Sequence, residues 1–70
     1  MITIRVHIKN IKNIVEELEQ CNNYSPFPLY DTEDIINLKK YKDSDKEFIT
    51  IKECNFFENT VEFIRRYNRK

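Results

Sequence analysis

Residues 31–42 read Asp-Thr-Glu-Asp-Ile-Ile-Asn-Leu-Lys-Lys-Tyr-Lys, and the fold depends on whether this stretch forms a helix or a strand. A helix is favoured by the Asp-Thr pair followed by two acidic residues, because this order is typical of a helix start. In a helix, Ile35, Leu38 and Tyr41 would form a thin apolar stripe.

The competing interpretation is a β-hairpin that pairs this stretch with residues 47–53, which have the composition of a strand. A polar four-residue turn at residues 43–46 would join the two strands. The hairpin register places four apolar side chains on one face, those of Ile36, Leu38, Ile49 and Ile51. Because this arrangement satisfies both strands at once, we predict the hairpin.

Residues 2–9 alternate between apolar and polar side chains, which predicts a half-buried strand. The inward side chains would be Ile2, Ile4, Val6 and Ile8, and the outward ones Thr3, Arg5, His7 and Lys9. Asn10 is a suitable N-cap for an amphipathic helix of about 11 residues that follows this strand. Its apolar stripe would contain Ile11, Ile14, Val15 and Leu18.

A second amphipathic helix is predicted from Phe56 to about Asn68. Asn55, with Glu58 three residues later, resembles a capping box at its start. The core stripe of this helix would contain Phe57, Val61 and Ile64. Residues 22–34 are the least regular segment and contain both prolines, so we predict a long loop there.

Together these elements predict one α+β domain over residues 1–70 with the order β-α-β-β-α. A right-handed crossover, with the third strand between the first two, gives a three-stranded sheet of order 1-3-2. Both helices would lie on one face of that sheet. This topology resembles a truncated ferredoxin-like fold that stops before a fourth strand.

The composition excludes several classes of protein. Twelve basic and 12 acidic residues give a formal charge of zero, which excludes a uniformly basic nucleic-acid coat and an acidic mimic acting by bulk charge. No apolar run is long enough to span a membrane. The chain has no glycine, so a phosphate-binding loop cannot be built. We therefore expect no nucleotide cofactor.

Catalysis and metal binding are also not expected. His7 is the only histidine, and no acidic residue is paired with it along the strand. Cys21 and Cys54 have no adjacent base, and one histidine with two cysteines argues against a zinc site. The first residues do not resemble a secretory signal, so we expect a cytoplasmic protein with reduced thiols and no cofactor or metal.

Three surfaces are candidates for binding a partner. The first is the helix-free face of the predicted sheet, which would gather cations, a histidine and two aromatics but no carboxylate. Its candidate residues are Arg5, His7, Lys9, Lys39, Tyr41, Phe48 and Lys52. Basic faces with aromatic side chains are used by single-stranded nucleic-acid binders.

The second surface is the free edge of the strand at residues 2–9, which would accept a strand from a partner or from a second copy of the chain. The third is the loop at residues 22–34, where Tyr24, Phe27 and Tyr30 would supply contacts to a partner. For this loop we favour the alternative in which Phe27 and Leu29 fold back on the core, leaving Tyr24 and Tyr30 exposed.

The function that these features favour is a non-enzymatic protein-binding module that regulates or inhibits a larger assembly. Residues with AT-rich codons dominate the composition, which suggests a low-GC bacterium or its phages and mobile elements, where small anti-defence inhibitors are common. The alternative is a single-stranded RNA- or DNA-binding module that uses the basic and aromatic sheet face.

Overall fold

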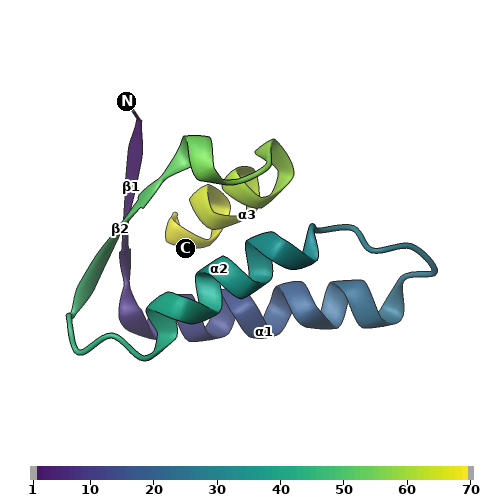
Figure 1. The fold of residues 1–70 in the computed structure, drawn as a ribbon, viewed down its shortest axis with the longest axis horizontal. Coiled ribbons are helices and arrows are strands. Elements are labelled where there is room, and N and C mark those ends of the chain that lie inside the picture. Colours follow the sequence, from purple (N-terminus) through teal and green to yellow (C-terminus); the bar gives the residue numbers. More distant parts are fainter. Residues whose placement is uncertain (1, 70) are drawn as a thin grey trace.

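A computed structural model describes residues 2–69, which form two strands, three α-helices and one short 3-10 helix (Figure 1). The elements are β1 (Thr3–His7), α1 (Ile8–Tyr24), α2 (Thr32–Lys42), β2 (Phe48–Lys52), η1 (Glu53–Asn55) and α3 (Glu58–Asn68). None of the helices in the described region is long and apolar enough to cross a bilayer.

The predicted hairpin is wrong, because residues 31–42 contain helix α2 instead of a strand. The Asp31 side chain caps the helix by accepting a hydrogen bond of 2.8 Å from the Glu33 N–H. Acidic residues in the first turn and three lysines in the last turn complement the helix dipole. Ile35 and Leu38 are buried while Ile36 is exposed, which is the helical stripe and excludes the strand pattern.

The sheet consequently has two strands in place of the predicted three, and the order of elements is β-α-α-β-α. β1 and β2 pair directly and antiparallel, with Thr3 opposite Lys52 and His7 opposite Phe48. The predicted strand order 1-3-2 and the truncated ferredoxin-like topology are therefore also wrong. With the middle strand replaced by α2, the only partner left for β1 within residues 2–69 is β2.

The alternation predicted for the first strand is confirmed over β1, where Ile4 and Val6 are buried and Arg5 is exposed. The strand ends earlier than predicted, at His7, and α1 follows without a connecting residue. The His7 imidazole caps α1 in place of Asn10, because its Nδ1 accepts a hydrogen bond of 3.1 Å from the Lys9 N–H. The predicted stripe of α1 is buried as expected.

Helix α3 begins two residues later than predicted, and its N-cap position is Phe57 instead of Asn55. The Asp34 carboxylate of α2 accepts hydrogen bonds from the Phe57 N–H at 3.0 Å and from the Thr60 hydroxyl at 2.8 Å. The Phe57 ring is 61% exposed, so its predicted place in the core is wrong. Val61 is buried as predicted.

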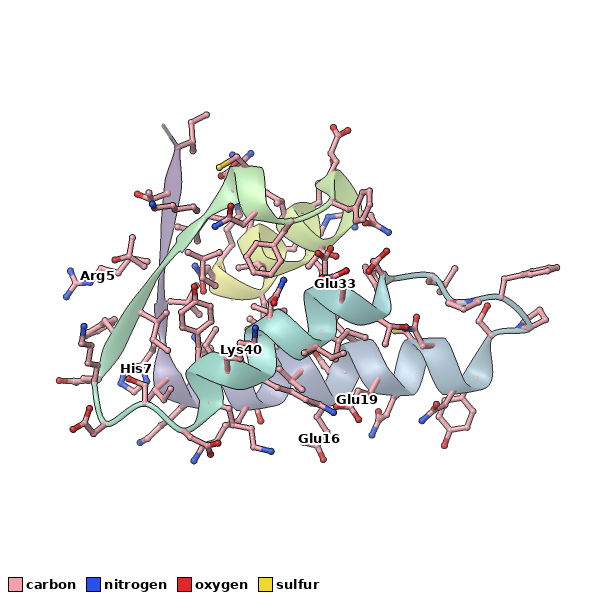
Figure 2. The ribbon with its side chains drawn as sticks, in the orientation of Figure 1. Arg5, His7, Glu16, Glu19, Glu33 and Lys40 are labelled. Carbon is pink, nitrogen blue, oxygen red and sulfur yellow. The ribbon has the colours of Figure 1, made fainter. Side chains whose placement is uncertain are left out.

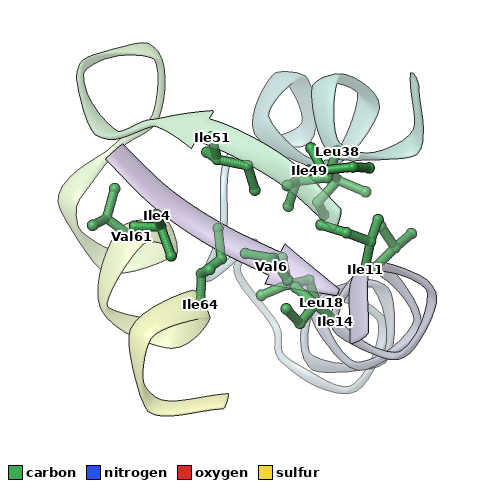
Figure 3. Packing of buried hydrophobic residues seen from close by; sticks show 12 residues of the cluster. Ile4, Val6, Ile11, Ile14, Leu18, Leu38, Ile49, Ile51, Val61 and Ile64 are labelled. Carbon is green, nitrogen blue, oxygen red and sulfur yellow. The ribbon is translucent and has the colours of Figure 1, made fainter. Parts of the chain in front are cut away.

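All five main elements contribute to one apolar core beneath the inner face of the sheet (Figure 3). Its members are Ile4, Val6, Ile11, Ile14, Val15, Leu18, Ile35, Leu38, Ile49, Ile51, Val61 and Ile64. α2 and η1 lie on the β2 side of the sheet, whereas α1 and α3 lie on the β1 side (Figures 1 and 3). The edge of β2 is therefore next to α2 and η1, and the edge of β1 is next to α1 and α3.

Candidate protein-binding surface along β2

The outer face of the two-stranded sheet carries a compact cluster of cationic and aromatic side chains. The Arg5 guanidinium lies 4.1 Å from the centre of the Phe48 ring, and the His7 ring meets the Phe48 ring edge-on at 5.0 Å. Figure 2 shows Arg5 on the side of the sheet away from the helices and His7 at the end of β1, where α1 begins. Lys52 lies on the same face of the sheet, at the far end of β2.

The basic face predicted from the sequence is only partly present. Lys9 lies in the first turn of α1, and Lys39 and Tyr41 lie on α2, so these three do not join the sheet face. Lys39 instead forms an ion pair of 2.8 Å with Glu19 of α1. A carboxylate also stands beside the face, because Glu47 lies 3.6 Å from His7 Nε2. The expected absence of carboxylates is therefore wrong.

The hydrogen-bond register determines which backbone groups remain free at the sheet edges. The N–H groups of Ile8 and Glu53 bond to the carbonyls of Glu47 and Ile2, at 2.9 and 3.2 Å. Because bonded and non-bonded pairs alternate in an antiparallel ladder, the residues between them point their amides alternately inward and outward. The outward amides belong to Thr3, Arg5 and His7 on β1 and to Phe48, Thr50 and Lys52 on β2.

The two edges differ in how far they are covered. On β1, the Asn68 side chain at the end of α3 donates a hydrogen bond of 3.1 Å to the Arg5 carbonyl. On β2, the outward backbone groups of Phe48 and Thr50 receive no hydrogen bond from any residue in the described range 2–69. The outward amides of β1 also lack a partner among residues 2–69, but its Arg5 carbonyl is occupied, so β2 is the less covered of the two edges.

A hollow of about 460 Å³ lies on the β2 side of the molecule, between α2 and η1. Asn37, Lys40 and Tyr41 line it from α2, and Asn55 and Phe56 line it from η1 and the residue that follows. Tyr41 and Phe56 are also packed against the core. We call the unpaired edge of β2 together with this hollow the β2 edge site.

Three cations near the β2 edge site have no ion-pair partner among the described residues. Lys40 lines the hollow, and Figure 2 shows it on the exposed side of α2. Arg5 and Lys52 stand on the sheet face above. The ion pairs in the described part of the chain use other cations, namely His7 with Glu47, Lys39 with Glu19 and Arg65 with Glu53. A segment bound here would therefore meet three cations without carboxylate partners.

The loop aromatics lie elsewhere. The Asn22 side chain exchanges two hydrogen bonds with the Tyr30 backbone, at 2.9 and 3.0 Å, which closes the loop. Phe27 at its tip is 75% exposed, so the expectation that it folds back on the core is wrong. Tyr30, expected to be exposed, packs partly buried against Phe63 at 5.7 Å. Tyr24 is the last residue of α1 and is 88% exposed.

Within residues 2–69, no three His, Cys, Asp or Glu side chains gather closely enough to hold a metal ion. Cys21 and Cys54 are both free thiols. The sequence matches no protein-family model and no curated protein, and the structure matches no solved structure. Function is therefore inferred from the geometry of the surface.

Proposed function

We propose that the protein is a non-enzymatic binding module that accepts an extended segment of a protein partner as a third strand on β2. The observation that carries this proposal is the unpaired outward backbone of Phe48 and Thr50, with the hollow between α2 and η1 on the same side of the sheet. In strand addition, main-chain hydrogen bonds supply affinity and pockets for alternate side chains supply specificity. The β2 edge site offers both.

The chemistry of the surface favours an acidic segment that also carries an aromatic or large apolar residue. Alternate side chains of an added strand point to opposite faces of the sheet. Those on the inner face would reach the hollow, where Tyr41 and Phe56 offer apolar contact. Those on the outer face would lie near Arg5 and Lys52, which favour carboxylates.

A module that covers such a segment would regulate or inhibit the larger assembly to which the segment belongs. We expect it to act in the reducing cytoplasm, since the free thiols Cys21 and Cys54 need no oxidising compartment. A small regulator of this kind suits a phage or mobile element that counters host defence, although no residue of the chain identifies the target.

The first test compares Thr50→Pro with Thr50→Val in binding to short peptides selected from a random display library. The N–H of Thr50 points outward and makes no hydrogen bond to β1, so proline removes only this outward donor. Valine keeps the N–H and serves as the control. We expect Thr50→Pro to weaken the selected acidic peptides about tenfold or more, and Thr50→Val to bind like the wild type. In the wild type, the Thr50 amide should become protected from hydrogen exchange when peptide binds.

Two outcomes would contradict this proposal. Peptides that bind equally well to Thr50→Pro would show that β2 does not pair with them. Loss of binding in Thr3→Pro, which blocks the outward amide of β1, with no loss in Thr50→Pro, would move the interface to the β1 edge. A second copy of the chain could occupy a strand edge in place of a partner. Sedimentation of the peptide-free protein tests this, because such a dimer would be abolished by Thr3→Pro or by Thr50→Pro.

The alternative function is binding of single-stranded nucleic acid by the outer sheet face. It is supported by the presence of Arg5, His7, Phe48 and Lys52 on one face, although Arg5 already covers one side of the Phe48 ring. Oligonucleotide affinity that falls steeply with salt and is reduced in Phe48→Ala would favour this alternative. Affinity that is unchanged by Phe48→Ala and Lys52→Ala would exclude it.

A further inference from the structure

A second hollow, of about 420 Å³, lies between α1 and α3 and is distinct from the β2 edge site. Four of its lining residues come from α1 and one from α3: Glu17, Gln20, Cys21, Tyr24 and Phe63. The α1 residues follow a spacing of three or four, which places them on one side of the helix. We call this hollow the α1–α3 groove.

The Glu17 carboxylate is the unusual group in this groove. Its Oε2 atom is buried, and it is the only buried side-chain oxygen or nitrogen within residues 2–69 that has no hydrogen-bond partner. A carboxylate oxygen removed from water without a partner is unfavourable, and a cationic donor relieves this penalty by a charge-assisted hydrogen bond. Glu17 therefore points to a cation as the missing partner.

The walls of the groove suit an organic cation. The Tyr24 ring is exposed at one end of α1, and the Phe63 ring comes from α3. Phe63 is held in place by Tyr30, edge-on at 5.7 Å, and by Tyr67, stacked at 6.4 Å. Aromatic faces attract ammonium groups through the ring quadrupole, and the rings also bury the alkyl chain.

No cation among residues 2–69 fills this position. The ion pairs of the described residues do not include Glu17, and no arginine or lysine lines the groove. The α3 arginines, Arg65 and Arg66, both lie outside the groove lining, and Arg65 is paired with Glu53. Because Oε2 is closed to solvent, a ligand in the groove meets the Glu17 carboxylate only when this partly buried side chain turns toward the groove, where the aromatic side chains already line the wall.

From these contacts we infer that the α1–α3 groove binds an alkylammonium group between Tyr24, Phe63 and the Glu17 carboxylate. The group would come from a free polyamine or from a lysine side chain of a bound protein, which present the same chemistry. This inference is independent of strand addition on β2, because the two sites share no residue.

The test is a titration with butylammonium chloride, followed by the amide chemical shifts of residues in the α1–α3 groove, with the neutral isostere 1-butanol as a comparison ligand. We expect butylammonium to bind more tightly than the alcohol. Glu17→Gln should weaken butylammonium about tenfold, which corresponds to about 1.4 kcal/mol, and leave the alcohol unchanged. Tyr24→Ala should weaken it about two- to fivefold.

Matched controls exist for both variants. Glu16→Gln removes the neighbouring carboxylate, which points away from the body of the molecule in Figure 2, and should leave the affinity unchanged. Phe27→Ala removes an exposed aromatic outside the groove. Equal binding of the amine and the alcohol, or equal effects of Glu16→Gln and Glu17→Gln, would overturn the inference. Because Tyr24 is 88% exposed, its substitution tests the site without a risk of unfolding.

Three further ligands separate the sources of the group. Spermidine is compared with Nα-acetyl-lysine amide, which keeps its side-chain ammonium group, and with a lysine-containing peptide. If spermidine binds more tightly and all are weakened by Glu17→Gln, the ligand is a free polyamine. If the lysine compounds bind more tightly, the ligand is a lysine side chain of a protein partner. A ligand series in which none responds to Glu17→Gln would contradict the inference for both sources. Thr50→Pro, which alters the β2 edge site, should leave all of these affinities unchanged.

Discussion

Asp34 illustrates at the scale of a single residue how a polar group connects two helices. Its carboxylate is buried, yet it accepts hydrogen bonds from both the Phe57 N–H and the Thr60 hydroxyl at the start of α3. The positive end of the α3 dipole further favours a negative charge at this place. Asp34 therefore fixes where α3 begins relative to α2.

We expect Asp34→Ala to lower the free energy of unfolding by about 2–4 kcal/mol, because it leaves the buried Thr60 hydroxyl and the partly buried Phe57 N–H without an acceptor. Urea denaturation followed by circular dichroism measures this change. The matched control is Glu33→Ala, whose side chain is exposed and should alter stability by less than about 0.5 kcal/mol. Similar losses in the two variants would contradict the role assigned to Asp34.

Tyr30 gives the molecule a pH dependence in the alkaline range. Burial raises the pKa of its hydroxyl above the ordinary value of 10.0, and the charge of Cys21 adds to this effect while Arg66 opposes it. The folded state thus holds this proton more tightly than the unfolded state. Its contribution to stability is complete below about pH 10 and is lost as the pH rises through the folded-state pKa.

The comparison that tests this linkage is wild type against Tyr30→Phe between about pH 9 and pH 11. Phenylalanine has no proton to lose, so the stability of the variant should fall less over this range. Absorbance titration of the hydroxyls should also show that the substitution removes the component with the highest pKa. Parallel stability curves for the two proteins would show that Tyr30 has the same pKa in the folded and unfolded states.

Part of this residue-scale chemistry could be predicted from the sequence. Asp34 precedes Leu38 by four positions, so a helical interpretation would have placed both on one buried face. Adjacent carboxylates such as Glu33 and Asp34 do not share a helix face and are ordinarily solvated, so the pair by itself gives no reason to bury Asp34. The orphaned oxygen of Glu17 could not be predicted, since it depends on where α3 crosses α1.

At the scale of elements, β1 and the stripe of α1 were predictable because each has one buried face and a regular period. α2 was not predictable, because the apolar residues of its segment fit both the helical spacing of three to four residues and the strand spacing of two. Isoleucine and tyrosine favour strands, and the apolar spacing fits a hairpin register. The decisive signals were at the ends, where Asp31 caps the helix and three lysines complement its last turn. Caps outweigh composition when the apolar pattern is ambiguous.

The register of α2 is tested by Leu38→Ala against Ile36→Ala. In a strand the two side chains would share a face, whereas in α2 Leu38 is fully buried and Ile36 is half exposed. We expect Leu38→Ala to destabilise the protein by about 2–5 kcal/mol and Ile36→Ala by less than about 1 kcal/mol. Thermal unfolding would disprove the helical register if the two substitutions had equal effects.

At the scale of the whole molecule, the pairing of β1 with β2 could not be read from local patterns. Each strand was predicted within a residue or two, but the identity of its neighbour depended on whether a third strand existed. The surface prediction failed for the same reason. The pairing of β1 with β2 places four of the predicted side chains on one face, those of Arg5, His7, Phe48 and Lys52. Lys39 and Tyr41 are not on that face, because their segment is helix α2 and not a strand.

Because every main element contributes to one core, we expect a single cooperative unfolding transition. Ile51→Ala, in the middle of the sheet and fully buried, should lower the stability of strands and helices together by about 2–5 kcal/mol. Far-ultraviolet circular dichroism and tyrosine fluorescence should give coincident urea curves in both proteins. Two separated transitions would indicate that the helical hairpin formed by α1, the loop after it and α2 is stable without the sheet.

The pairing of Thr3 with Lys52 also has a consequence for the time course of folding. The two helices between the strands are local contacts that form quickly, whereas the sheet closes a loop covering most of the chain. The α1–α2 hairpin should therefore form first and bring the strands within reach of each other. During synthesis, β1 emerges long before its partner strand exists, so its alternating apolar face stays unpaired until β2 leaves the ribosome.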